Sequence, residues 1–336
     1  MYERGDGMKL AAGSISAYPN NLSVCCLESK NITYACVVHK TQIHIVNWDN
    51  KNENVSWDSI NVLDTSTDKP VDALQAAIVF PNIRTCPLLV VGTTIGAQIF
   101  DIRTQKLLHQ ESIDKEMNKS FLWNSFCRGI TWNDNFILVG TSSGHIIQFQ
   151  CNGETSIVTK KCLREHPASI ADMATCRYDE VTCSCDCSGT IIVWSKCFKG
   201  VQLKMATQHP ITAMNVLNNQ VIVGTLRGRV LFFSMSTSEL IAELCEVFAH
   251  ARSVTCVSVA PEAARVLTGS EDGRFIVYKL HTMTAQAFQA EYLYCDELPN
   301  CAIMGAQFTN SRGSNIAVAC FDRNVLYGYH TVRNTA

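Results

Sequence analysis

A short pattern that recurs along the whole chain limits what this sequence can fold into. An apolar run, a small polar turn ending in glycine and a second apolar run follow one another, which is typical of a β-hairpin. Five clear copies occupy residues 90–102, 138–150, 182–195, 222–234 and 267–280. Their turn glycines recur about every 40–50 residues, a period that indicates the blades of a β-propeller.

Two weaker copies, at 34–48 and 316–330, flank these five, and the last has Asp322 and Asn324 around Arg323 in place of the turn glycine. Aspartate and asparagine also tolerate the backbone of such turns. A strand-like run precedes each hairpin and an outer run follows it. The sequence therefore predicts one all-β domain, a seven-bladed β-propeller of four-stranded antiparallel blades. The expected blades cover residues 20–62, 71–112, 125–162, 168–207, 210–246, 252–290 and 300–331.

The ends and the connections of this ring need separate attention. The last blade lacks an outer run after Tyr329, and we expect a strand at residues 9–14 to supply it and remove the open edge. Segments 103–120 and 282–298 fit outer strands with long loops. The polar segments 47–59 and 64–70 are predicted to be exposed loops, with docking or modification as the alternative role.

Composition excludes several classes of function. The chain has 336 residues, 47 % of them hydrophobic, and a net charge of −2, which gives no global attraction to nucleic acid or to anionic membranes. The first ten residues are charged where a signal peptide is apolar, and no later run is long enough to span a membrane. We therefore expect a cytoplasmic protein. Its 17 cysteines then act as small buried hydrophobes in a reducing compartment.

Two blades share a set of polar and aromatic positions. A histidine before the blade is followed by a hydroxyl residue, an aspartate and an aromatic residue: His166, Thr182, Asp186 and Trp194 in the fourth blade, and His250, Thr268, Asp272 and Tyr278 in the sixth. In this the chain resembles the WD-repeat β-propellers. The resemblance implies that each set is a structural tetrad linking the loop before a blade to its second strand, hairpin turn and third strand. It also implies a non-enzymatic interaction platform.

Catalytic and metal-binding interpretations of these residues are weaker. The fourth-blade set contains the residue types of a catalytic triad, but its strand positions place the groups between strands, where a lost partner costs about 1–3 kcal/mol. Cys183, Cys185 and Cys187 in the same hairpin suggest zinc or redox chemistry. Their side chains diverge along a strand, however, and lack the usual C-x2–4-C spacing. We expect neither a metal nor another cofactor.

A better candidate for function is the face that carries the hairpin turns and the loops before each blade, here called the hairpin face. The resemblance implies that these segments lie together. They contribute apolar residues, arginines, a histidine and an acid: Ile95, His145, Leu226, Arg227, Arg252, Glu271, Arg274, Phe321 and Arg323. Such a mixture suits a peptide or loop of another protein, because arginine binds carboxylates in bidentate fashion and is enriched at interaction hot spots. The alternative is that they are ordinary solvated loop residues.

The leading prediction is therefore a scaffold for protein–protein interactions, with other proteins as partners and no nucleic acid. Self-association and recruitment to vesicles through a partner remain open. An enzyme or small-ligand binder that uses the axial channel is the alternative. Against catalysis, Glu271 and Asp322 are the acids expected on the hairpin face, and no nucleophile accompanies them. The glycine turns also lack the order of a phosphate-binding loop.

Overall fold

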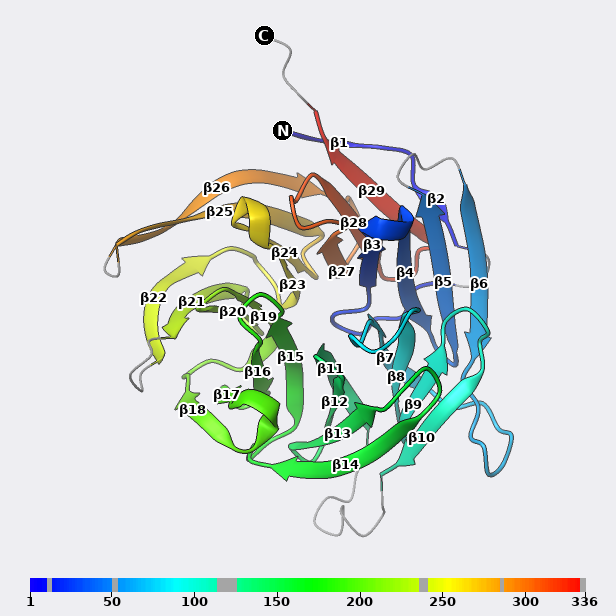
Figure 1. The fold of residues 1–336 in the computed structure, drawn as a ribbon. Coiled ribbons are helices and arrows are strands. Elements are labelled where there is room, and N and C mark those ends of the chain that lie inside the picture. The colour runs from blue at the N-terminus through cyan, green and yellow to red at the C-terminus, as the bar shows by residue number, and fades with distance from the viewer. Residues whose placement is uncertain (11–13, 50–53, 114–125, 236–240, 285–286, 333–336) are drawn as a thin grey trace.

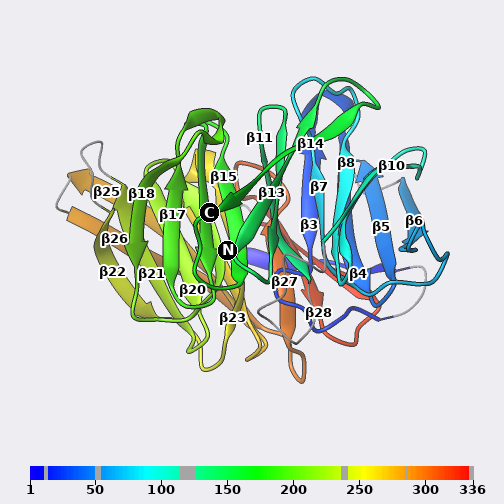
Figure 2. The same ribbon diagram turned by 90° about the horizontal axis from the view of Figure 1, so that it is seen from below.

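Seven twisted sheets surround a common axis (Figure 1), and Figure 2 shows the same ring from the side. This computed structural model describes the chain except residues 11–13, 50–53, 114–125, 236–240, 285–286 and 333–336. Each sheet is one blade with antiparallel strands in chain order from the axis outward. The predicted seven-bladed propeller of four-stranded blades is therefore confirmed.

The strands of the first four blades follow the sequence repeat. The first blade has β3 (Ser23–Leu27), β4 (Ile32–His39), β5 (Gln42–Asp49) and β6 (Val55–Asn61), and the second has β7 (Ala73–Val79), β8 (Leu88–Thr93), β9 (Gly96–Asp101) and β10 (Leu107–Ser112). The third has β11 (Cys127–Asn133), β12 (Phe136–Thr141), β13 (His145–Cys151) and β14 (Ile157–Arg164), and the fourth has β15 (Ile170–Cys176), β16 (Val181–Asp186), β17 (Thr190–Trp194) and β18 (Val201–Ala206).

The last three blades repeat the same order. The fifth has β19 (Ile211–Leu217), β20 (Gln220–Thr225), β21 (Arg229–Met235) and β22 (Ile241–Phe248), and the sixth has β23 (Val254–Ala260), β24 (Arg265–Ser270), β25 (Arg274–Thr284) and β26 (Ala287–Glu297). The seventh has β27 (Ile303–Phe308), β28 (Asn315–Cys320) and β29 (Val325–Thr331). Three short 3-10 helices, η1 (Glu28–Lys30), η2 (Lys196–Phe198) and η3 (Pro261–Ala263), lie in connections within the described part of the chain.

The N-terminus closes the ring, as predicted, but with different residues. β1 (Tyr2–Arg4) and β2 (Met8–Lys9) both pair antiparallel with β29 and complete the seventh blade. The expected strand at 9–14 thus overlaps the observed ones only at Lys9, and residues 11–13 lie outside the described part. The closing strands start earlier because Tyr2 is itself a core residue, 5 % exposed in the cluster between the sixth and seventh blades.

The two polar segments differ from each other. Part of 47–59 is not a loop, because residues 55–61 form β6, the outer strand of the first blade. Four consecutive residues of β6 are exposed, since an outer strand faces solvent at the rim, and the sequence therefore has the composition of a loop. The 64–70 segment is a turn in which Asp64 accepts hydrogen bonds from Ser66 and Thr67.

The two ambiguous segments contain outer strands. β10 lies within 103–120, and residues 114–125 are outside the described part. In the sixth blade β25 and β26 each have 11 residues and form a hairpin that projects from the ring (Figure 1).

The turn glycines of the repeat are required by backbone geometry. Gly228 has φ +77°, and a Cβ atom there would lie 2.1 Å from the carbonyl oxygen of His250 in the following loop. In the last turn Asp322 takes the left-handed conformation in place of glycine, at φ +54°. A threonine fixes some of these turns, as Thr225 Oγ1 accepts a hydrogen bond from Arg229 N and donates one to its carbonyl.

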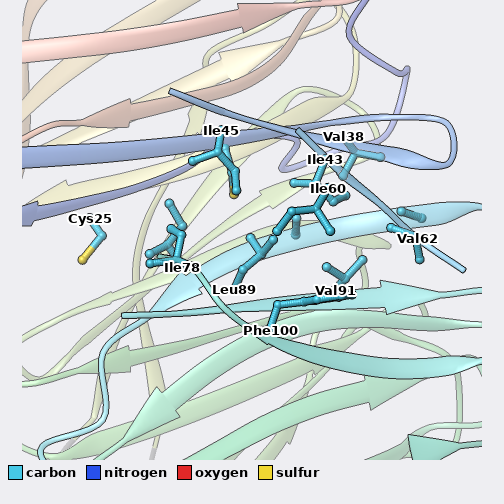
Figure 3. Close-up of a cluster of buried hydrophobic side chains, with 14 of the residues drawn as sticks. Cys25, Val38, Ile43, Ile45, Ile60, Val62, Ile78, Leu89, Val91 and Phe100 are labelled. Carbon is cyan, nitrogen blue, oxygen red and sulfur yellow. The ribbon is translucent and has the colours of Figure 1, made fainter. Parts of the chain in front are cut away.

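Neighbouring blades bury their faces against each other. Between the first two blades, Ile43, Ile45 and Ile60 face Leu89 and Val91 (Figure 3). Because middle strands are covered on both faces, they are apolar nearly throughout, which explains the runs that flank each turn. Cysteines contribute to these layers, and within the fourth-blade hairpin Cys183 and Cys185 are fully buried against the fifth blade. The expectation that the cysteines are buried is wrong for Cys187 and Cys197, which are exposed.

Candidate functional site

The fourth-blade tetrad is a closed hydrogen-bond chain between the pre-blade loop and the hairpin. His166 Nδ1 lies 3.0 Å from Asp186 Oδ2, and His166 Nε2 lies 2.6 Å from the hydroxyl oxygen of Ser184. Trp194 Nε1 donates to the same hydroxyl at 2.8 Å. With a neutral imidazole that donates from Nδ1 to Asp186, His166 Nε2 accepts a hydrogen bond from the Ser184 hydroxyl, whose oxygen accepts from Trp194. Burial lowers the pKa of His166, which favours that neutral form.

The hydroxyl of this tetrad belongs to Ser184, so the prediction of Thr182 is wrong. Thr182 is buried one pleat farther from the turn, where its Oγ1 lies 3.0 Å from Thr175 Oγ1 and accepts a bond from Asn133 at 3.1 Å. Both side chains point to the same side of the strand, and distance from the turn decides which reaches His166. The sequence held the necessary signal: Ser184 stands five residues before its turn glycine, as Thr268 does in the sixth blade.

The sixth blade brings together three of its four predicted residues. His250 Nε2 lies 2.9 Å from Thr268 Oγ1, and His250 Nδ1 lies 3.3 Å from Asp272 Oδ2. Burial raises the pKa of Asp272, but hydrogen bonds from His250, Arg274 and Ala251 outweigh it and bring the pKa to about 2. Tyr278 is buried at the tryptophan position, and the described residues show no hydrogen bond from it to Thr268.

The polar groups of the fourth-blade tetrad are enclosed within the blade. His166, Ser184 and Asp186 are buried, and each hydrogen-bonding atom of the chain described above is used within the blade. Asp186 Oδ1 is also occupied, because it accepts bonds from Ser188 and Thr190. No group of three or more potential metal ligands gathers anywhere in the described residues.

The hairpin-face residues fall into two groups. Three are engaged in the fold: Ile95 lies against the core of the first two blades, His145 lies 3.2 Å from the Ser143 hydroxyl, and Arg274 pairs with Glu297 at 2.9 Å. The others are exposed at the turns or loops, and none of their side chains forms an ion pair with a described residue: Leu226, Arg227, Arg252, Glu271, Phe321 and Arg323.

The exposed group lies on the fifth, sixth and seventh blades and includes a residue that sequence reasoning missed. Leu226 and Phe321 are 55 % and 47 % exposed, and Phe248, at the end of β22, is 75 % exposed. Arg229 lies over the Phe248 ring at 4.4 Å and also pairs with Glu246. Phe248 was missed because it ends a partly apolar run, which sequence reasoning assigned to the outer strand of the fifth blade and not to the hairpin face. A position two residues before the His250 loop was the signal that could have placed it on this face.

The axis of the ring is a polar channel of about 420 Å³ lined by the innermost strands of all seven blades. Two neighbouring innermost strands meet at each joint of the ring. There a side chain of one strand forms a hydrogen bond to the next strand, in most cases to a backbone group. The partners are Ser23 with Ile78, Gln75 with Gly129, Thr131 with Thr175, Asp172 with Met214, Asn215 with Val257, Ser258 with Phe308, and Gln307 with Val24.

The fold is similar to that of a solved structure. The structure resembles a chain from the crystal structure of a mitotic checkpoint complex, with a TM-score of 0.73 over 98 % of this chain and 92 % of that one; at 14 % identity this shows the fold alone. No helix in the described residues could span a membrane.

Sequence relatives cover nearly the whole length. WD repeat-containing protein 54 of Mus musculus is 25 % identical over 99 % of this chain and 100 % of its own length. The Homo sapiens protein of that name is 25 % identical over 92 % and 94 %. WD-repeat propellers typically mediate protein interactions. The family model WDR54 matches residues 1–332, and the chain therefore belongs to the WDR54 family.

Proposed function

We propose that this protein is a non-enzymatic cytoplasmic scaffold that binds another protein through its hairpin face, at the fifth to seventh blades. The observation that carries the proposal is the exposed group of Leu226, Phe248 and Phe321 beside arginines without ion-pair partners in the described residues. Large apolar side chains next to arginine are typical of interaction hot spots. A closed ring holds these turns at fixed spacing, so a partner would bind without ordering the loops.

Electrostatics favour an acidic partner segment. Arg229 and Arg274 are neutralised by Glu246 and Glu297, which leaves Arg227, Arg252 and Arg323 against the exposed acids Glu271 and Asp322. Bidentate bonds from these arginines to carboxylates, with an apolar anchor on Phe321 or Leu226, would give both affinity and orientation.

The test is affinity purification with mass spectrometry on matched baits. One bait carries Arg227→Glu and Arg323→Glu. The control bait carries Lys196→Glu in η2 and Arg312→Glu in the turn between β27 and β28, both at the opposite ends of the strands, with side chains 79 % and 77 % exposed. All baits must show the melting temperature of the unaltered chain. We expect specific partners that the control retains and the first variant loses. Partners retained by both variants would move the binding site away from the hairpin face.

A further inference from the structure

The links that hold the ring together leave the axial channel rich in hydrogen-bond donors. Ser23, Gln75, Ser258 and Gln307 line the channel, and each uses its side-chain oxygen to accept a backbone N–H of the next blade. The oxygen that holds the blade is therefore occupied. What remains is a hydroxyl proton on each serine and the Nε2 amide on each glutamine, for which the described residues supply no partner.

A polar cluster lies at the hairpin-face end of the channel, where Asn20 is a lining residue. Asn20 Nδ2 lies 3.3 Å from both carboxylate oxygens of Asp172, which also accept bonds from the backbone of Met173 and Met214. The Asp172 charge attracts the buried guanidinium of Arg128, whose Nη2 donates to the carbonyl of Thr212. These groups offset part of the Asp172 charge, and Asp172 itself is not among the residues that line the channel.

The other end opens on the face opposite the hairpin face, among the turns between first and second strands. Arg177 lies there over the ring of Trp132 at 4.5 Å, and it forms no ion pair with a described residue. Tyr178, 64 % exposed, and Glu28 also lie at this end. Arg177 is the one base and Glu28 the one acid among the residues that line the channel. An open mouth with an available guanidinium thus leads into a chamber of neutral donors.

We propose that the axial channel binds a small organic anion, with a carboxylate or phosphate at Arg177 and acceptor oxygens directed to Gln75 and Gln307. The channel volume of about 420 Å³ lies in the range of small-molecule pockets. This site is separate from the hairpin face, so it stands or falls independently of the proposed scaffold function. The ligand would bind the same Gln75 and Gln307 side chains that link neighbouring blades, which predicts that the ligand stabilises the closed ring.

The test is calorimetric titration of the full chain with glucose 6-phosphate, citrate and, as a neutral control, glucose. The channel variant is Gln75→Glu with Gln307→Glu, which keeps the oxygens that accept from Gly129 and Val24 and removes the donors. Gln202→Glu, exposed on an outer strand, is its matched control. Arg177→Gln, at the exposed mouth, is a second variant that leaves the interior intact.

We expect at least one of the two anions to bind, glucose not to bind, and the ligand to raise the melting temperature. Arg177→Gln should weaken that binding about 10-fold to 100-fold, the channel variant should abolish it, and Gln202→Glu should leave it unchanged. Glu28→Gln should leave it unchanged or tighten it. Tighter binding of citrate would identify a carboxylate as the preferred acid group, and tighter binding of glucose 6-phosphate would identify a phosphate. Absence of binding for both up to about 10 mM, equal binding of glucose, or unchanged binding in Arg177→Gln would overturn the proposal.

Discussion

Replacing Ser184 by alanine tests the tetrad assignment most directly. The Ser184 hydroxyl serves two buried nitrogens, His166 Nε2 at 2.6 Å and Trp194 Nε1 at 2.8 Å. The described residues provide no second partner for either, so both would be left unsatisfied in the interior. Each such group costs about 1–2 kcal/mol, and we expect a loss of about 2–4 kcal/mol in the free energy of unfolding. For a chain of 336 residues that is a fall of roughly 3–6 °C in the melting temperature.

Thr182→Val is the matched control in the same strand. Its partners keep other bonds, because Asn133 still donates to the Glu180 carbonyl at 2.8 Å and Thr175 still contacts Thr131 at 2.9 Å. Its cost should therefore stay near about 1 kcal/mol. Thermal melting followed by circular dichroism compares the two variants. The reasoning fails if Ser184→Ala melts within about 1 °C of the unaltered chain, or if Thr182→Val is the more damaging change.

Three further predictions concern backbone, closure and pH. Gly228→Ala should lower the melting temperature by several degrees, because φ is +77° and the new Cβ would meet the His250 carbonyl. Gly153→Ala, which has open space around it, should leave the melting temperature unchanged. Equal melting temperatures for the two variants would refute this. Deleting residues 1–9 removes both closing strands, and light scattering should then show aggregation through the exposed edge; an unchanged monomer would contradict it. Burial raises the pKa of Asp172 to about 6, so the folded chain favours its protonated form and the free energy of unfolding should fall as pH rises from about 4 to 6. Asp172→Asn should remove that decline in urea titrations. A free energy of unfolding that declines equally in the variant and the unaltered chain would count against this reasoning.

The sequence was sufficient for the fold because its signals are local and repeated. A turn residue with positive φ, glycine in five blades, and two flanking apolar strands specify one hairpin, and seven such hairpins specify the ring. Register was harder to predict: Thr182 and Ser184 have the same strand parity, and only their distance from Gly189 separates them. The closing strands were misplaced for a similar reason. Two short strands of two and three residues leave almost no periodicity, and the burial of Tyr2 depends on blades far away in sequence.

An axial channel was expected from the sequence, but its polar lining could not be predicted, because the lining arises from side chains of seven different repeats. The linking residues of the seven innermost strands are of five types, namely serine, glutamine, threonine, aspartate and asparagine, so no motif recurs in the sequence. Only the folded ring shows that all of these residues link one innermost strand to the next.

These joint bonds also explain how five blades remain regular without the tetrad. A tetrad ties a blade to its own preceding loop, whereas a joint bond ties two innermost strands to each other, as Gln307 does with Val24 where the chain ends meet. The blades without a tetrad are held at both neighbours by joint bonds and by their apolar faces. Loss of the tetrad then costs one blade some local stability but does not open the ring. Substitutions at a joint should instead weaken two blades at once. Gln307→Leu should therefore lower the melting temperature more than Thr268→Val does.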